Sequence, residues 1–224
     1  MIDAMQAPSA GGFRLKYLVF AAIALMAAYV LYHNERFLIE PTNPVWQHYE
    51  PFKWWLLSHG LAGSCALFLA PMQFSTRIRN RFLRVHQTIG AIYVIGALVL
   101  SPLGVIIQTF DEAQGAARSF TIETAIQASL LAITTAFGLF FALRRQIDQH
   151  RRWMIRSYAA ALTFLEIRVI LGVFGLDDPF DWHTIETVVW SCTASALLVG
   201  DIANEIYEQV NAPAPLRRRQ RVAA

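Results

Sequence analysis

Long apolar runs alternate with short polar segments along the chain. Six runs cover residues 17–32, 54–74, 86–107, 120–143, 153–176 and 184–207. Most of them suit an α-helix that crosses the hydrocarbon core of a bilayer, which needs roughly 17 to 25 residues. Lipid offers no hydrogen-bond partners, so a spanning segment must satisfy its own backbone groups, as a helix does. The pattern therefore predicts an all-α polytopic membrane protein, a helix bundle of about six transmembrane helices.

The same pattern divides the chain into three parts. We expect residues 1–16 to be a cytoplasmic N-terminal segment, residues 17–208 a transmembrane helix-bundle domain, and residues 209–224 a basic cytoplasmic tail. Basic residues followed by an apolar run are also typical of a signal peptide. The first run lacks a small-residue cleavage site before the charged segment that begins at His33, so we interpret it as an uncleaved anchor.

The charged residues indicate which way the bundle faces. Cytoplasmic loops of membrane proteins carry an excess of Lys and Arg. With the N-terminus in the cytoplasm, the basic segments 75–85, 144–156 and 217–221 all fall on the inner side, and the outer loops are mainly acidic. We therefore predict a multi-pass protein of the bacterial inner membrane with both termini cytoplasmic. The basic tail suits anionic lipid better than nucleic acid.

Composition supports a membrane location and excludes several function classes. Apolar residues make up 55% of the chain and charged residues 16%, whereas a soluble domain has about 25% charged residues. Two cysteines lie in different apolar runs and form no CxxC motif. The sequence has no Walker loop, HExxH or GxSxG motif, so nucleotide-dependent and hydrolase chemistry are not indicated. Whether the protein is an enzyme stays open.

Histidines stand at both ends of the predicted bundle. His86 and His150 lie at inner ends of apolar runs, whereas His59 and His183 lie near outer ends, as does His33. Facing helices of a bundle can hold haem iron between two imidazoles. This arrangement makes His86 and His150 candidate axial ligands of a haem b, with His59 and either His183 or His33 as a weaker outer pair.

Glycines lie one turn from two of these histidines and affect whether a haem could fit there. Gly63 follows His59 and Gly90 follows His86 at helical spacing. A missing side chain at these positions leaves room for a flat macrocycle. The alternative interpretation is that the histidines are ordinary interfacial residues and that the glycines let helices pack closely.

Glu166 and Arg168 lie deep within the fifth apolar run. A charge near the bilayer centre costs about 2.5 to 3.5 kcal/mol on insertion scales. Residues two apart on a helix face opposite sides, so each needs a partner from another helix. Candidate partners are Glu123 or Glu186 for Arg168, and a hydroxyl, a histidine or a bound group for Glu166. Three roles stay open for these charges: they fix helix packing, they line a site for a small ligand, or both extend to the outer interface.

Arg152 and Arg156 lie one turn apart at the start of the same run. They share a helix face, and guanidinium groups bind phosphates and carboxylates well. Two roles stay open for them, which are topology anchoring and the binding of lipid phosphate or an acidic substrate.

Three motifs together resemble a known family. They are the stretch 150–158 (HRRWMIRSY) with Arg168, the stretch 84–90 (RVHQTIG) with Tyr93, and His59-Gly60 with the stretch 71–74 (PMQF). These motifs are similar to those of a family of predicted bacterial membrane proteins catalogued as a domain of unknown function, of the kind numbered 2306. The resemblance covers roughly residues 50–205 and implies a multi-span integral membrane protein without implying an activity.

Three hypotheses for function follow from the sequence. The most concrete is membrane electron transfer linked to haem b or to a quinone. The second is a transporter or small-ligand binder built around Glu166 and Arg168. The third is a structural or assembly protein whose polar residues only fix the packing of its helices.

Overall fold

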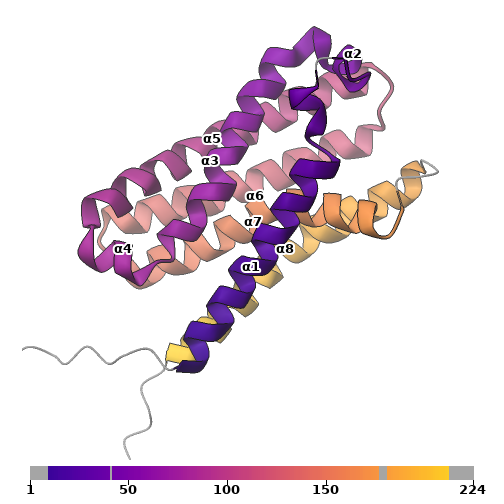
Figure 1. Cartoon of the computed structure of the whole chain (residues 1–224). Coiled ribbons are helices and arrows are strands. Elements are labelled where there is room, and N and C mark those ends of the chain that lie inside the picture. Colours follow the sequence, from indigo (N-terminus) through magenta and orange to yellow (C-terminus); the bar gives the residue numbers. More distant parts are fainter. Residues whose placement is uncertain (1–9, 41, 177–180, 212–224) are drawn as a thin grey trace, which may run out of the picture.

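The computed structural model describes residues 10–40, 42–176 and 181–211, and every regular element within them is a helix (Figure 1). The long helices are α1 (Ala10–His33), α3 (Lys53–Gln73), α5 (Leu83–Ala113), α6 (Arg118–Leu143), α7 (Ile147–Val173) and α8 (Trp182–Asn211). The short ones are η1 (Arg36–Ile39), α2 (Val45–Tyr49), η2 (Glu50–Phe52) and α4 (Thr76–Arg81). The all-α prediction is confirmed.

Five of the long helices are long and apolar enough to cross a membrane. The candidate spans are Leu15–His33, Trp46–Gln73, Leu83–Ala113, Arg118–Leu143 and His183–Val210. α7 is not among them, although it has 27 residues, because it carries charged residues that include Arg156, Glu166 and Arg168. The structure therefore supports a multi-pass membrane protein and sets α7 apart as its most polar long helix.

The long helices from α3 to α8 pack in chain order. α3 packs against α5, α5 against α6, α6 against α7, and α7 against α8, while α1 lies against α7 and α8 (Figure 1). α7 also contacts α3. The polar helix therefore has apolar helices on several sides.

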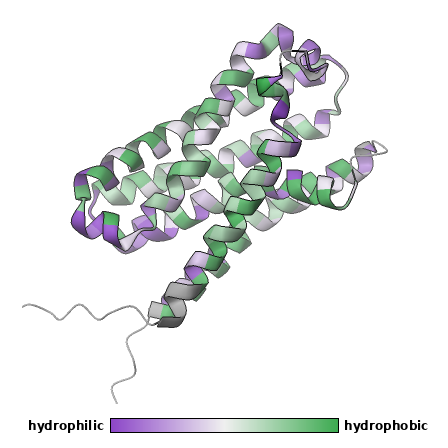
Figure 2. Ribbon diagram, viewed as in Figure 1, coloured by the Kyte–Doolittle hydropathy of each residue, from purple (hydrophilic) through white to green (hydrophobic). Residues whose placement is uncertain are grey.

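Hydrophilic residues gather at the two ends of the bundle (Figure 2). One end, here called the basic end, holds the start of α5 and of α7 with the arginines of 77–84 and 144–152. The opposite end, here called the acidic end, holds Glu35, Glu50, Asp111 and Asp181. Between the ends, large apolar side chains such as Leu25, Leu61 and Leu198 are exposed, as expected for a surface that faces lipid rather than water.

Small residues let α3 and α5 approach each other closely. Ala62, Ala66 and Ala70 are buried at four-residue spacing along α3. Gly96 of α5 lies against them, because a Cβ atom on this glycine would come within 3.0 Å of the Ala62 carbonyl oxygen. Helices in membranes associate through such small-residue contacts, since apolar burial gives little advantage over lipid.

Several element boundaries differ from the sequence-based prediction. α1 begins at Ala10, so part of the expected N-terminal segment is helical. The expected loop at 33–53 contains η1, α2 and η2. α5 continues through Pro102 to Ala113. Residues 1–9 and most of the basic tail, 212–224, lie outside the described residues.

Replacement of Gly96 by leucine should destabilise the bundle by roughly 1 to 3 kcal/mol, because the new side chain would overpack the α3–α5 contact. The measurement is thermal unfolding of the detergent-purified variant. Gly60→Leu is the matched control, since a Cβ atom there meets nothing within 4 Å. Equal stability of the two variants would contradict this account of the packing.

Candidate functional site

Two of the predicted site histidines lie at the basic end. His86 is in the first turn of α5 and His150 is in the first turn of α7. Both side chains are partly buried, and the two rings are close enough to interact electrostatically. The bundle brings them together because α5 and α7 run in the same direction and begin at the same end.

One hydrogen bond fixes the protonation pattern of His150. Its Nδ1 lies 2.8 Å from the carbonyl oxygen of Gly138 on α6. A carbonyl oxygen can only accept, so Nδ1–H is the donor and Nε2 carries the free lone pair of the neutral ring. Histidines that bind metals are commonly oriented by this kind of bond.

Two polar atoms at the basic end are buried and have no hydrogen-bond partner among the described residues. They are Nδ1 of His86 and Nε2 of Gln73. Gln73 ends α3, and its amide oxygen would lie 3.2 Å from a Cβ atom on Gly90. The space beside Gly90 is therefore occupied by the Gln73 side chain. Buried polar groups normally have partners, so these two atoms mark a place suited to a polar ligand.

A buried chain of hydroxyl groups lies deeper in the bundle. Ser157 on α7 makes hydrogen bonds of 2.7 Å with the Tyr93 hydroxyl on α5 and of 2.7 Å with the Thr135 hydroxyl on α6. All three side chains are fully buried. Tyr93 lies two turns from His86, so it shares the same face of α5. The bonds join three helices next to the histidine pair.

The outer histidines are not arranged as a pair. His59 lies between α3 and α5, because its ring carbon Cε1 would lie 3.2 Å from a Cβ atom on Gly104. His183 and His33 are exposed, and His33 contacts the rings of Tyr29 and Tyr32. The structure thus places His86 and His150 at the same end of the bundle, whereas His183 and His33, the two residues predicted to pair with His59, are both exposed.

Arg168 makes no ion pair among the described residues. It is near enough to Glu35, in the segment after α1, and to Tyr49 of α2 to interact with them electrostatically. Its pairing with Glu123 or Glu186 stays a prediction. Those glutamates accept hydrogen bonds from hydroxyl groups, of Thr193 and of Ser119 respectively.

Glu166 has other neighbours than Arg168. The thiol of Cys192 on α8 interacts electrostatically with both Glu166 and Glu123. Glu123 on α6 is only 4% exposed. Two carboxyl groups, a thiol and the Thr193 hydroxyl therefore form a second polar cluster, between α6, α7 and α8.

Arg152 and Arg156 form ion pairs with acidic residues of α8. Arg152 Nη2 lies 2.7 Å from Glu208, and Arg156 Nε lies 2.6 Å from Asp201. The side-chain amide of Asn204 donates to the Arg152 carbonyl oxygen at 3.1 Å. These arginines connect α7 to α8 at the basic end. The ion pairs use some of the guanidinium N–H groups that could otherwise bind a phosphate or a carboxylate.

These features define an integral membrane protein with several membrane-capable helices and a polar interior around α7. The chain belongs to the family described as "Predicted membrane protein (DUF2306)", whose model matches residues 56–203. No curated protein and no solved structure matches the chain. The resemblance drawn from the three motifs is confirmed, and the match runs from α3 into α8 without α1. The family description gives a membrane location and no activity.

Sequence reasoning missed several residues that shape the site. Gly138 belongs to no motif, because a glycine in an apolar run has no special pattern, and Ser157 is distinguished in the sequence only as part of the stretch 150–158. Gln73 stood out only within a family motif. Glu35 was counted as an outer-loop charge, since nothing in its neighbours in sequence indicates contact with Arg168.

The Glu35 contact predicts a pH dependence of stability. Burial raises the pKa of Glu35 above its ordinary value, and Arg168 partly offsets this rise. The folded protein therefore holds the proton of Glu35 more tightly than the unfolded chain does. Protonated Glu35 contributes fully to the stability of the fold below its ordinary pKa, and this contribution is lost as pH rises through its pKa in the folded protein. Glu35→Gln should remove this loss.

The measurement is the thermal midpoint in detergent from about pH 4 to about pH 8. Arg168→Gln should steepen the fall with pH, because the offsetting charge is gone. Glu40→Gln is the control, since this residue pairs with the exposed Arg36. A wild-type slope in Glu35→Gln would contradict the assignment.

Proposed function

We propose that this protein transfers electrons within the membrane through a haem b held by His86 and His150. The proximity of the two imidazoles at the basic end is the observation that carries the proposal. Their positions on separate helices of one bundle match the way in which two histidines ligate haem iron.

Three features of this chain fit a haem at that place. The bond from His150 to the Gly138 carbonyl leaves Nε2 free to act as a ligand. His86 has a buried ring nitrogen without a partner among the described residues. Gln73 offers an amide N–H, and its flexible side chain would turn away from Gly90 to admit a flat ring. A haem there would supply one-electron transfer.

The remaining residues of the site orient an axial histidine and exclude water. Gly138 holds the His150 ring in orientation, and the Tyr93–Ser157–Thr135 hydroxyl chain fills the interior below without admitting bulk water. A quinone is the electron partner that we favour, because it dissolves in the lipid around the bundle.

The test is a reduced-minus-oxidised visible spectrum of the detergent-purified protein, with metal analysis of the same sample. We expect sharp haem bands that are lost in His86→Ala and in His150→Ala, because each variant removes one axial ligand. His183→Ala is the matched control, since this side chain is exposed and should leave the bands unchanged.

Two outcomes would overturn the proposal. One is a metal-free blank from a monodisperse, well-folded sample. The other is a haem spectrum that persists when His86 and His150 are both replaced by alanine. Either result moves the weight to the polar cluster of Glu166.

A small-ligand or transport function is the second candidate. It is supported by Glu166, which makes no ion pair among the described residues and lies near Cys192 together with Glu123. Arg168 belongs to the separate group at the acidic end, so this candidate rests on Glu166 more than on Arg168. If Glu166→Gln changes only thermal stability, the cluster has a structural role.

We also propose that α7 is a sixth span, that both termini are cytoplasmic and that the membrane is the bacterial inner membrane. The 27-residue length of α7 and the enclosure of its charges by neighbouring helices support the span. The arginines of the basic end support the orientation by the positive-inside rule.

Cysteine labelling tests this topology. In a Cys65→Ala, Cys192→Ala background, Asp181→Cys should react with a membrane-impermeant maleimide, because it lies at the acidic end. The reagent is added to cells whose outer membrane has been removed and whose inner membrane is intact. Arg145→Cys, in the turn before α7, should react only after permeabilisation. Labelling of both positions from the same side would contradict six spans.

A further inference from the structure

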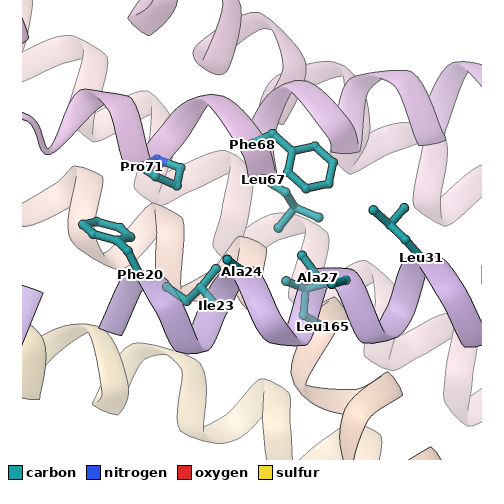
Figure 3. Close-up of a pocket in the computed structure, with 10 residues that line it drawn as sticks. Phe20, Ile23, Ala24, Ala27, Leu31, Leu67, Phe68, Pro71 and Leu165 are labelled. Atoms are coloured by element: carbon teal, nitrogen blue, oxygen red, sulfur yellow. The ribbon is translucent and has the colours of Figure 1, made fainter. Parts of the chain in front are cut away.

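An apolar groove separates α1 from α3 (Figure 3). It has a volume of about 320 Å³ and is lined by residues of 20–31 on α1 and of 67–71 on α3, with Leu165 of α7 at its floor. Phe20 and Pro71 lie toward one end of the groove and Leu31 lies toward the other (Figure 3).

The groove exists because α1 packs on α7 and carries small residues toward α3. Ala27 and Val30 pack against Leu165, and Tyr29 packs against Gly172. Ala24 and Ala28 are exposed on the groove side. An open apolar channel in the lipid-facing surface of a membrane protein is filled by hydrocarbon, because its walls offer water almost no partners.

Two positive charges lie where the groove reaches the basic end. Lys16, one turn before Phe20, donates a hydrogen bond to the carbonyl oxygen of Phe74, and its Nζ lies 5.9 Å from the centre of the Phe20 ring. Arg79 of α4 is close enough to repel it. Neither cation has a carboxylate partner among the described residues.

This pair of cations favours an anionic group. An ammonium group has three donors, and Lys16 uses one of them for Phe74. A phosphate oxygen placed between Lys16 and Arg79 would relieve their repulsion and take the remaining donors. Basic pockets between helices at a membrane surface are typical places for anionic lipid head groups.

We infer that the groove binds an anionic phospholipid, with its phosphate at Lys16 and Arg79 and one acyl chain between α1 and α3. The length agrees, since the helical rise from Phe20 to Leu31 covers roughly 16 Å. That is about half of the roughly 30 Å hydrocarbon core, which is the depth that a chain from one leaflet reaches. One anionic phospholipid would thus pair with the two cations and fill the groove.

The experiment measures lipid binding to the delipidated full chain in detergent by native mass spectrometry. The probes are phosphatidylglycerol and phosphatidylcholine with the same acyl chains. We expect wild-type protein to bind phosphatidylglycerol at least about tenfold more tightly, and Lys16→Gln with Arg79→Gln to lose this preference. The matched control is Arg144→Gln with Arg145→Gln, which removes two exposed charges from the same end.

A second pair of variants tests the acyl-chain groove. Ala24→Phe fills it and should weaken phosphatidylglycerol binding about tenfold, whereas Ala22→Phe, which is exposed on α1 outside the lining, should not. A photoactivatable phosphatidylglycerol should crosslink wild-type protein within 20–31 or 67–71, which needs no variant.

Three results would overturn the inference. They are equal binding of the two lipids, unchanged binding by Ala24→Phe in a monodisperse sample, and crosslinks spread evenly over the lipid-facing helices. Displacement of the lipid by inorganic phosphate alone would show a soluble-anion site instead.

Discussion

The need to shelter the polar groups of α7 from lipid governs the arrangement of this bundle. A charge or an unpaired polar group in hydrocarbon is costly, and α7 carries more such groups than the other long helices. Each neighbour satisfies a different one: Tyr93 of α5 and Thr135 of α6 bond to Ser157, and Asp201 of α8 pairs with Arg156. Glu35, in the segment after α1, is near enough to Arg168 for electrostatic interaction. The packing order of the apolar helices follows from these contacts.

Close helix packing brings polar groups within hydrogen-bonding distance. The two proposed binding sites lie where this close packing is interrupted. The approach of α3 to α5 at Gly96 and of α6 to α7 at Gly138 brings polar groups within bonding distance. At the basic end the packing leaves ring and amide nitrogens of His86 and Gln73 unsatisfied. Along α1, where contact with α3 is lost, an apolar groove opens. Both proposed ligands would therefore bind at places where the helices are not in close contact.

Much of the architecture was predictable, and some of the site was. The length of the apolar runs predicted the helices. Because successive spans alternate in direction, the sequence predicted that His86 and His150 lie at the same end of the bundle. The proximity of Arg168 to Glu35 was not predictable, because Glu35 belongs to a connecting segment whose path depends on where α1 packs.

The sequence by itself determined the kind of protein, since apolar runs of span length can be satisfied only as membrane helices and basic clusters mark their ends. It did not determine which helix faces meet. That depends on the rotation of each helix about its axis and on the packing order, which small residues such as Gly96 and buried bonds such as that of Ser157 select together. Only the tertiary structure decided that His150 is oriented by Gly138, that His59 stands against Gly104, and that α1 leaves a groove beside Lys16.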